Sequence, residues 1–179
     1  LKAIDPYMAV KHSLRLDGKK LILGSKDRPL SELDLNGYDR IFIVGGGKAT
    51  APMARAVEEL LGKQIIRGII NVKYGFTERL TYTEIIEAGH PLPDQNGVEG
   101  TRQILDLLED ASENDLVFSL ISGGGSALLT QPAGNITLKE KQEVTSSLLA
   151  CGAGIDEINA VRKHISSSKG GQMARAAYP

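Results

Sequence analysis

The sequence predicts an α/β protein with a doubly wound, mainly parallel sheet and helices on both faces. Three observations predict this class. Short apolar runs typical of buried strands alternate with helical patterns between residues 40 and 165. Two of these runs end in glycine triplets, and ligands of open α/β sheets bind at such turns. The composition, 41% hydrophobic and 24% charged, is typical of globular chains.

The start of the chain predicts a short helix and then an N-terminal β-hairpin. Asp5-Pro6 combines an N-cap with a proline at the first helical position, so a helix is expected over 7–14. Asp17-Gly18 lies between two apolar runs and is the strongest short hairpin signal, which predicts paired strands over 14–23. No element is predicted in the polar stretch that follows.

The remaining elements alternate between strand and helix. Nearly continuous apolar runs predict strands at 40–44, 65–72, 84–87 and 115–121. Helical spacing and capping signals predict helices at 49–61, 98–111, 137–150, 156–165 and 172–176. Thr137 and Glu140 form a capping box, and Asp156 is the expected N-cap of the next helix. Together these elements predict one Rossmann-like α/β domain over 1–179.

Composition also excludes several function classes. The net charge is 21 − 22 = −1 and tryptophan is absent, so the chain lacks the basic, aromatic surface of a nucleic-acid binder. The single cysteine, Cys151, cannot form an internal disulfide, which favours a cytoplasmic setting. The longest charge-free run, 116–138, is broken by glycines and a proline, so no membrane span is expected. The chain opens with Leu1 and shows no signal-peptide pattern. A chain shortened at either end is consistent with this start.

The two glycine triplets predict an anion site. Glycine allows the backbone to approach a phosphate closely, and a helix amino terminus adds free N–H groups and a partial positive charge. Flanking serine hydroxyls can donate to phosphate oxygens. The expected phosphate- or nucleotide-binding residues are Gly45, Gly46, Gly47, Ser122, Gly123, Gly124, Gly125 and Ser126. The alternative is that the glycines only make tight turns.

Known loop motifs do not fit these triplets. A P-loop fails because Phe42 replaces its first glycine and Ala49 its Ser or Thr. A dinucleotide fingerprint fails at Thr50, and the next strand lacks the acidic residue that would bind a ribose, which disfavours hydride transfer with NAD. A hydrolase elbow at Ser126 fails because Leu128 replaces its last glycine.

Several basic side chains are candidates for ligand contact. Lys48 is expected in the first turn of its helix, where it repels the partial positive charge of the helix, and a bound anion would resolve that conflict. A solvated lysine is the alternative. His90 precedes a loop proline, and the stretch 159–171 gathers basic residues beside a Ser/Gly turn. A structural histidine and a solvated helix face are the alternatives there.

These motifs, in order along the chain, resemble those of the glycerate 2-kinases that have a separate C-terminal domain, a family sometimes named hydroxypyruvate reductases. The resemblance covers about 5–179. It rests on 45–49 with 53–54, and on 73–75, 88–94, 120–128 and 159–171. The chain departs from the family pattern at Phe76, where histidine is common, and at Ser168, where an aliphatic residue is usual.

The resemblance implies an enzyme that transfers the γ-phosphoryl group of ATP, with Mg²⁺, to the 2-hydroxyl of D-glycerate. It implies that Lys48 contacts the transferring group or the substrate and that the loop 122–126 binds phosphate. The expected substrate-binding residues are His90, Asn159, Arg162, Lys163 and Lys169. No metal ligand is expected here, because the second domain should bring the acidic residues and a catalytic arginine. The 179-residue chain would then be an N-terminal part with little or no activity alone.

Two other functions stay open at this point. One is a non-catalytic sugar-phosphate or nucleotide-binding module on the same sheet. The other is a hydroxypyruvate reductase, against which the missing ribose-binding acid already counts. The expected partners are the small-molecule substrate and the nucleotide, and a homo-oligomer is one alternative for the assembly.

Overall fold

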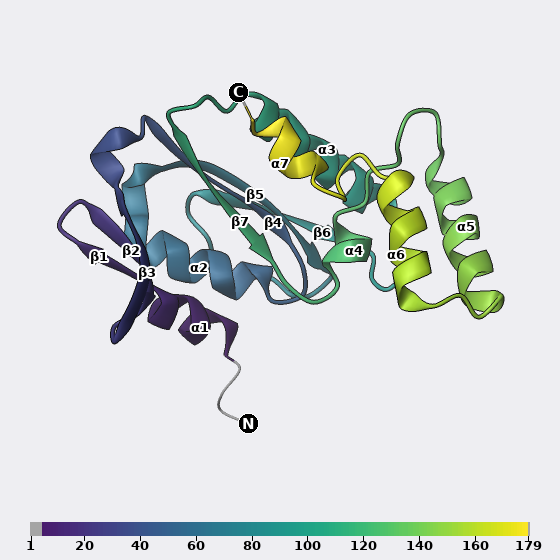
Figure 1. Cartoon of the computed structure of the whole chain (residues 1–179), viewed down its shortest axis with the longest axis horizontal. Coiled ribbons are helices and arrows are strands. Elements are labelled where there is room, and N and C mark those ends of the chain that lie inside the picture. Colours follow the sequence, from purple (N-terminus) through teal and green to yellow (C-terminus); the bar gives the residue numbers. More distant parts are fainter. Residues whose placement is uncertain (1–4, 179) are drawn as a thin grey trace.

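Two sheets organise the chain in the computed structural model, which describes residues 5–178 (Figure 1). The strands are β1 (Leu14–Asp17), β2 (Lys20–Ser25), β3 (Arg28–Asp34), β4 (Arg40–Gly46), β5 (Ile65–Lys73), β6 (Thr83–Ala88) and β7 (Asp115–Ile121). The helices are α1 (Pro6–Ser13), α2 (Thr50–Leu61), α3 (Gln95–Glu109), α4 (Gly125–Leu128), α5 (Leu138–Ala150), α6 (Ile155–His164) and α7 (Gln172–Ala176). Two short 3-10 turns are η1 (Leu35–Gly37) and η2 (Gly62–Gln64).

The smaller sheet is antiparallel, in the order β1-β2-β3. The predicted hairpin is confirmed, with Leu14 opposite Leu23 and Asp17 opposite Lys20. Strand β3 was not predicted, because six of its seven residues are exposed and its sequence carries no alternation of apolar and polar residues. Main-chain pairing with β2 forms this strand, and Pro29 is tolerated because β3 is an edge.

The larger sheet is fully parallel, in the order β6-β5-β4-β7. The chain enters at β4, moves outward through β5 to β6, and then returns to the other side of β4 as β7. The order therefore reverses between β4 and β7, and such a reversal places a crevice outside the carboxyl ends of the two strands.

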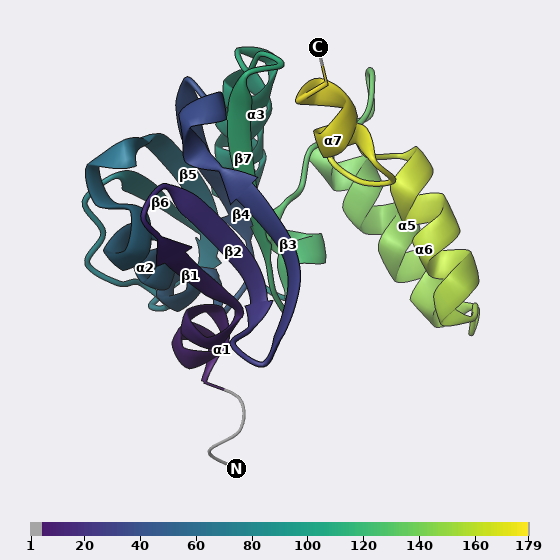
Figure 2. The same ribbon diagram turned by 60° about the vertical axis from the view of Figure 1, so that its left-hand side comes forward.

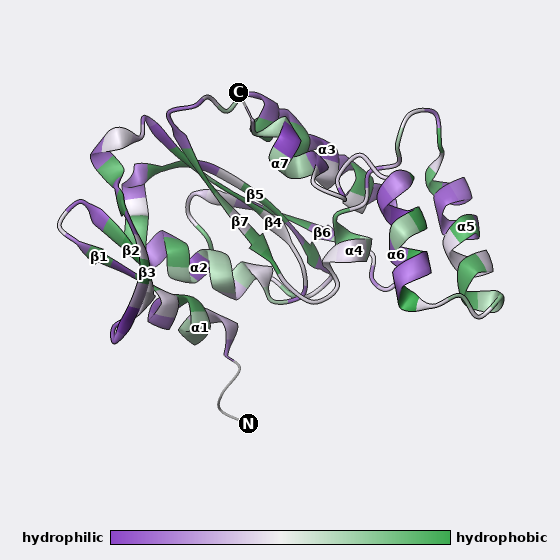
Figure 3. Cartoon of the chain, viewed as in Figure 1, coloured by the Kyte–Doolittle hydropathy of each residue, from purple (hydrophilic) through white to green (hydrophobic). Residues whose placement is uncertain are grey.

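Helices cover both faces of this sheet, as predicted (Figure 2). On one face α2 buries Ala51, Ala54 and Val57 against the strands, and the small sheet adds Leu21 to the same core. On the other face α3 buries Ile104 and Leu108, and α7 joins the same cluster. Apolar residues accordingly follow the central strands (Figure 3). Among the helices of residues 5–178, none has the length and apolar character needed to span a bilayer.

Two helix starts differ from the prediction. Helix α3 begins at Gln95, with Asp94 as its N-cap, because its first turn is polar and carries no apolar spacing. Helix α6 has Gly154 as its N-cap, so the prediction of Asp156 was wrong by two residues. The amide of Gly154 donates to the Glu157 carboxylate at 2.8 Å, which places Asp156 inside the first turn. The capping box of α5 at Thr137 is confirmed.

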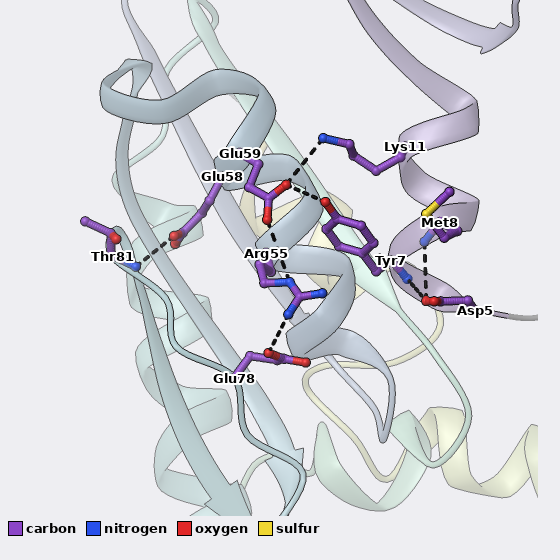
Figure 4. A network of polar contacts seen from close by, with 9 residues as sticks. All are labelled: Asp5, Tyr7, Met8, Lys11, Arg55, Glu58, Glu59, Glu78 and Thr81. Carbon is purple, nitrogen blue, oxygen red and sulfur yellow. Dashed lines mark hydrogen bonds and ion pairs between the residues drawn. The ribbon is translucent and has the colours of Figure 1, made fainter.

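A polar network fastens α1 to α2 (Figure 4). The Tyr7 hydroxyl donates to the Glu59 carboxylate at 2.5 Å, and Lys11 Nζ lies 3.3 Å from the same oxygen. The Arg55 guanidinium lies 4.4 Å from the centre of the Tyr7 ring and 3.1 Å from Glu78. These contacts hold the N-terminal helix on the face of the sheet opposite α3.

Candidate functional site

The two glycine triplets meet at the point where the strand order reverses. Gly45 and Gly46 of β4 pair in register with Leu120 and Ile121 of β7. Beyond the strands, the amide of Lys48 donates to the Gly123 carbonyl at 2.9 Å. The two loops therefore lie against each other at the carboxyl ends of β4 and β7 (Figure 1).

The first triplet is buried and serves this close approach. A Cβ at Gly45 would collide with the Leu120 carbonyl, and one at Gly47 with the Ser122 hydroxyl. The amides of residues 47–49 are also occupied, because they donate to the Asn71 carbonyl (3.0 Å), the Gly123 carbonyl (2.9 Å) and Ser122 Oγ (3.0 Å). These three amides are therefore not available to a phosphate.

The second triplet presents free donors. Gly124 has φ +93° and is the N-cap of the single-turn helix α4. Within residues 5–178, the amides of Gly123, Gly124 and Ser126 have no hydrogen-bond acceptor. A Cβ at Gly124 would lie 2.9 Å from the His90 ring and 3.4 Å from the Lys48 side chain. The loop thus brings its free amides together with two of the predicted site residues.

The two flanking serines have different roles. Ser122 Oγ accepts a hydrogen bond from the Ala49 amide and lies 3.2 Å from Thr50 Oγ1, so it ties the loops together. Ser126 is exposed and borders a cavity. Of the two hydroxyls predicted to contact phosphate, only that of Ser126 is directed to open space.

Lys48 is exposed and lies one residue before Ala49, the N-cap of α2. The expectation that it occupies the first turn of the helix was wrong, because its amide turns toward Gly123 and α2 begins only at Thr50. No carboxylate of the described chain forms an ion pair with it. The partial positive charge of the α2 amino terminus still lies close to the Lys48 backbone.

A cavity of about 430 Å³ lies between α4, α6 and the turn before α7. It is bordered by four of the five residues predicted to bind substrate, Asn159, Arg162, Lys163 and Lys169, together with Ser126 and the apolar Ile121, Leu129 and Met173. The fifth, His90, lies at the adjacent triplet instead. A wider groove of about 850 Å³ runs along α5 but contains none of the predicted site residues.

Sequence reasoning missed Lys141, a buried lysine behind this cavity. Its side chain comes from the first turns of α5, and its Nζ donates to the Ile165 carbonyl at 2.8 Å. Burial and the charge of Arg162 lower the pKa of Lys141 to about 8. Lys141 carries no signal in the sequence, because it lies outside every motif and only tertiary packing brings α5 to the 165–169 turn.

The pKa of Lys169 is also lowered. Its Nζ donates to the Leu129 carbonyl at 2.6 Å, and burial, followed by the charges of Lys141 and Arg162, lowers its pKa to about 7. Ser168, which departs from the family pattern, is buried and donates to the same carbonyl at 2.8 Å. The cavity is therefore electropositive and polar on this side. As for metal ligands, residues 5–178 hold no group of three or more His, Cys, Asp or Glu side chains that could bind an ion.

Comparison with known proteins shows which family the chain matches and which proteins it resembles. It matches over residues 1–179 the model of a family described as "Domain of unknown function (DUF4147)". It is 43% identical over 177 residues to the D-glycerate 2-kinase of Thermotoga maritima, covering 98% of this chain and 42% of that protein. It is 45% identical over 140 residues to a putative hydroxypyruvate reductase of Agrobacterium vitis, covering 78% of this chain and 32% of that protein.

A crystal structure of a Pyrococcus horikoshii protein is also similar, with a TM-score of 0.89 and 41% identity over 99% of this chain and 39% of that one. The chain thus spans 42% of the Thermotoga protein, 39% of the Pyrococcus protein and 32% of the Agrobacterium protein. The family match covers the chain from end to end, and the fold agrees with it. The chain belongs to the DUF4147 family, and glycerate 2-kinases are among its homologues.

Proposed function

We propose that the protein containing this chain transfers the γ-phosphoryl group of ATP to the 2-hydroxyl of D-glycerate, and that this chain is the N-terminal part of a two-domain enzyme. One observation carries the proposal. Lys48, His90 and the free amides of the second triplet gather at the point where the strand order reverses. The names of the homologues support the substrate and the reaction class. A cytoplasmic location fits the single, exposed Cys151.

Phosphoryl transfer requires mainly positioning and neutralisation of charge, and the residues beyond the carboxyl ends of β4 and β7 suit both tasks. The Lys48 ammonium would contact the oxygens of the transferring group, since no carboxylate in residues 5–178 competes for it. The amides of Gly123, Gly124 and Ser126 would donate to phosphate oxygens. Mg²⁺, when bound, would neutralise charge on the phosphates, and we expect its ligands from residues outside this chain.

The cavity beside α6 would hold the acceptor. D-glycerate is a small monoanion with two hydroxyl groups, and Arg162 and Lys169 offer positive charge for its carboxylate. Asn159 and the Ser126 hydroxyl offer hydrogen bonds to its hydroxyls. We assign the first triplet a different role from the one its sequence suggests, because its glycines let the two loops pack together and its neighbouring amides are occupied.

A hydroxypyruvate reductase is the second candidate, because one relative carries that name. A dinucleotide enzyme of this fold uses an acidic side chain after the second strand of its nucleotide-binding unit to bind the ribose. Strand β5 ends at Asn71-Val72-Lys73 without an acidic residue, and Asn71 is fully buried and donates to the Leu128 carbonyl at 2.8 Å. The Asn71 side chain is therefore used inside the fold and is not available to bind a ribose, which counts against the reductase.

The decisive test uses the full-length protein. We expect ATP, Mg²⁺ and D-glycerate to yield ADP and 2-phosphoglycerate, identified by ³¹P NMR, with L-glycerate as a control for the substrate. Oxidation of NADH by hydroxypyruvate would favour the reductase instead. Tight binding of 2-phosphoglycerate or ATP with no turnover would favour the non-catalytic binding module.

A further inference from the structure

Three cationic side chains from separate elements converge at the cavity: Arg162 and Lys169 border it, and Lys141 lies behind them. Lys141 reaches from α5 and donates to the carbonyls of Ile165 (2.8 Å) and Gln131 (3.4 Å). Lys169, from the turn before α7, donates to the Leu129 carbonyl. Arg162, from α6, borders the same cavity. The two lysines thus donate to the backbone carbonyls of one short stretch, residues 129–131.

These three cations have no acidic partner. None of them takes part in an ion pair within the part of the chain that the structure describes. The carboxylates nearest to Lys141 on α5 are used elsewhere: Glu140 accepts from the Thr137 amide at 2.8 Å, and Glu143 pairs with Lys139 at 3.8 Å. Among residues 5–178, carbonyl oxygens accept from the two ammonium groups and no carboxylate pairs with them.

A buried cation without a counter-charge is unfavourable, and the protein can relieve it in two ways. The lysine can lose its proton, or an anion can enter and neutralise it. Lys141 is 5% exposed, and the pKa values of about 8 and about 7 for Lys141 and Lys169 reflect the first response. An anion bound beside Lys169 would produce the second response, in which the charge of the lysine is neutralised.

We propose that Lys141 is a positioning residue of the cavity, and that an anion bound beside Lys169 is accompanied by uptake of protons at the two lysines. The ligand class is a small anion with a carboxylate or other oxyanion group. That D-glycerate is the natural ligand rests on the proposed function, whereas the coupling of anion and proton does not. Lys141 acts through Lys169, because its charge opposes protonation of the second ammonium.

The sign of the pH dependence follows from this coupling. Below about pH 7 both ammonium groups are already charged, so the anion binds without proton uptake. Above that pH each bound anion must bring a proton with it, so affinity falls as the pH rises, by about tenfold per pH unit for one proton. His164 and Lys163, also on α6, are exposed, and His164 Nδ1 lies 2.7 Å from the carbonyl of Ala160 on its own helix.

Sulfate is the suitable probe, because it does not titrate between pH 6 and 9.5 and does not depend on kinase activity. Calorimetry on the full-length protein should show constant sulfate affinity up to about pH 7 and a steep decline above it. Lys169→Met should remove the part of this decline that begins near pH 7 and leave only a decline that begins near pH 8, where Lys141 loses its proton. His164→Gln should leave the whole decline unchanged and so exclude the histidine as its source. A pH-independent affinity in the unmodified protein would overturn the proposal, whether or not D-glycerate is the substrate.

The role of Lys141 is tested by Lys141→Met, with Lys139→Met, whose side chain is 84% exposed on the same helix, as the matched control. Removing the charge of Lys141 should raise the pKa of Lys169, so the pH at which sulfate affinity begins to fall should move upward. Lys139→Met should not move it. A uniform loss of affinity at every pH, without movement of that pH, would reduce Lys141 to a structural residue and contradict the proposal. If Lys141→Met does not fold, the profiles of the unmodified protein and Lys169→Met still decide the proton coupling.

Discussion

Gly47 lies where the two loops of the candidate site are in contact. It has φ +149°, and a side chain there would meet the Ser122 hydroxyl and the backbone behind it. The position of Lys48 depends on this contact, because the Lys48 amide donates to Gly123 in the neighbouring loop. The absence of a side chain at Gly47 therefore allows the loop contact that brings the Lys48 side chain beside the second triplet.

This geometry makes a prediction for stability. Gly47→Ala should lower the free energy of unfolding by about 3 kcal/mol or more, because it adds both a collision and an unfavourable φ. Gly134→Ala is the matched control, since Gly134 has φ +54° but nothing within 4 Å of the added Cβ. It should cost only about 1 to 2 kcal/mol, because only the left-handed backbone opposes the new side chain. Urea unfolding measures both, and equal losses in the two variants would show that the collision at Gly47 is relieved.

At the scale of elements, β4 and β7 are joined at both ends. Their carboxyl ends carry the glycine loops, and their amino ends are clamped by Arg40, which donates to Asp115 at 2.7 Å and to Asp110 at 2.8 Å. The Asp115 side chain is fully buried, whereas that of Asp110 is 68% exposed. The hydrogen bond from Arg40 lowers the pKa of Asp115 to about 2.

The clamp predicts how stability depends on pH. Because the pKa of Asp115 is depressed on folding, its contribution is present above about pH 4 and is lost as the pH falls toward 2. Asp115→Asn should cost about 2 kcal/mol at pH 6, and this difference from the unmodified protein should shrink toward pH 2. Asp110→Asn should cost less than about 1 kcal/mol, because its partner contact is exposed. A constant difference between pH 6 and pH 2 would contradict the assignment.

At the scale of the whole molecule, the sequence predicted what apolar patterning and capping encode. The parallel strands, the helices on both faces and the helix over 172–176 follow from such local signals. Strand β3 did not, because an edge strand held by main-chain pairing leaves no trace in hydropathy. Lys141 did not either, because its burial arises only when α5 packs on the 165–169 turn. The triplets were recognised, but only their packing shows that the first is buried beneath the loop contact.

The central claim is that Lys48, beside the second triplet, stabilises the transferring phosphoryl group. Its most direct test is the turnover of Lys48→Met in the full-length protein, with ATP, Mg²⁺ and saturating D-glycerate, beside Lys139→Met on the exposed face of α5. We predict that kcat falls about 100-fold or more in Lys48→Met, while KM for D-glycerate changes little and Lys139→Met retains full activity. Turnover of Lys48→Met within twofold of the unmodified enzyme would contradict the account.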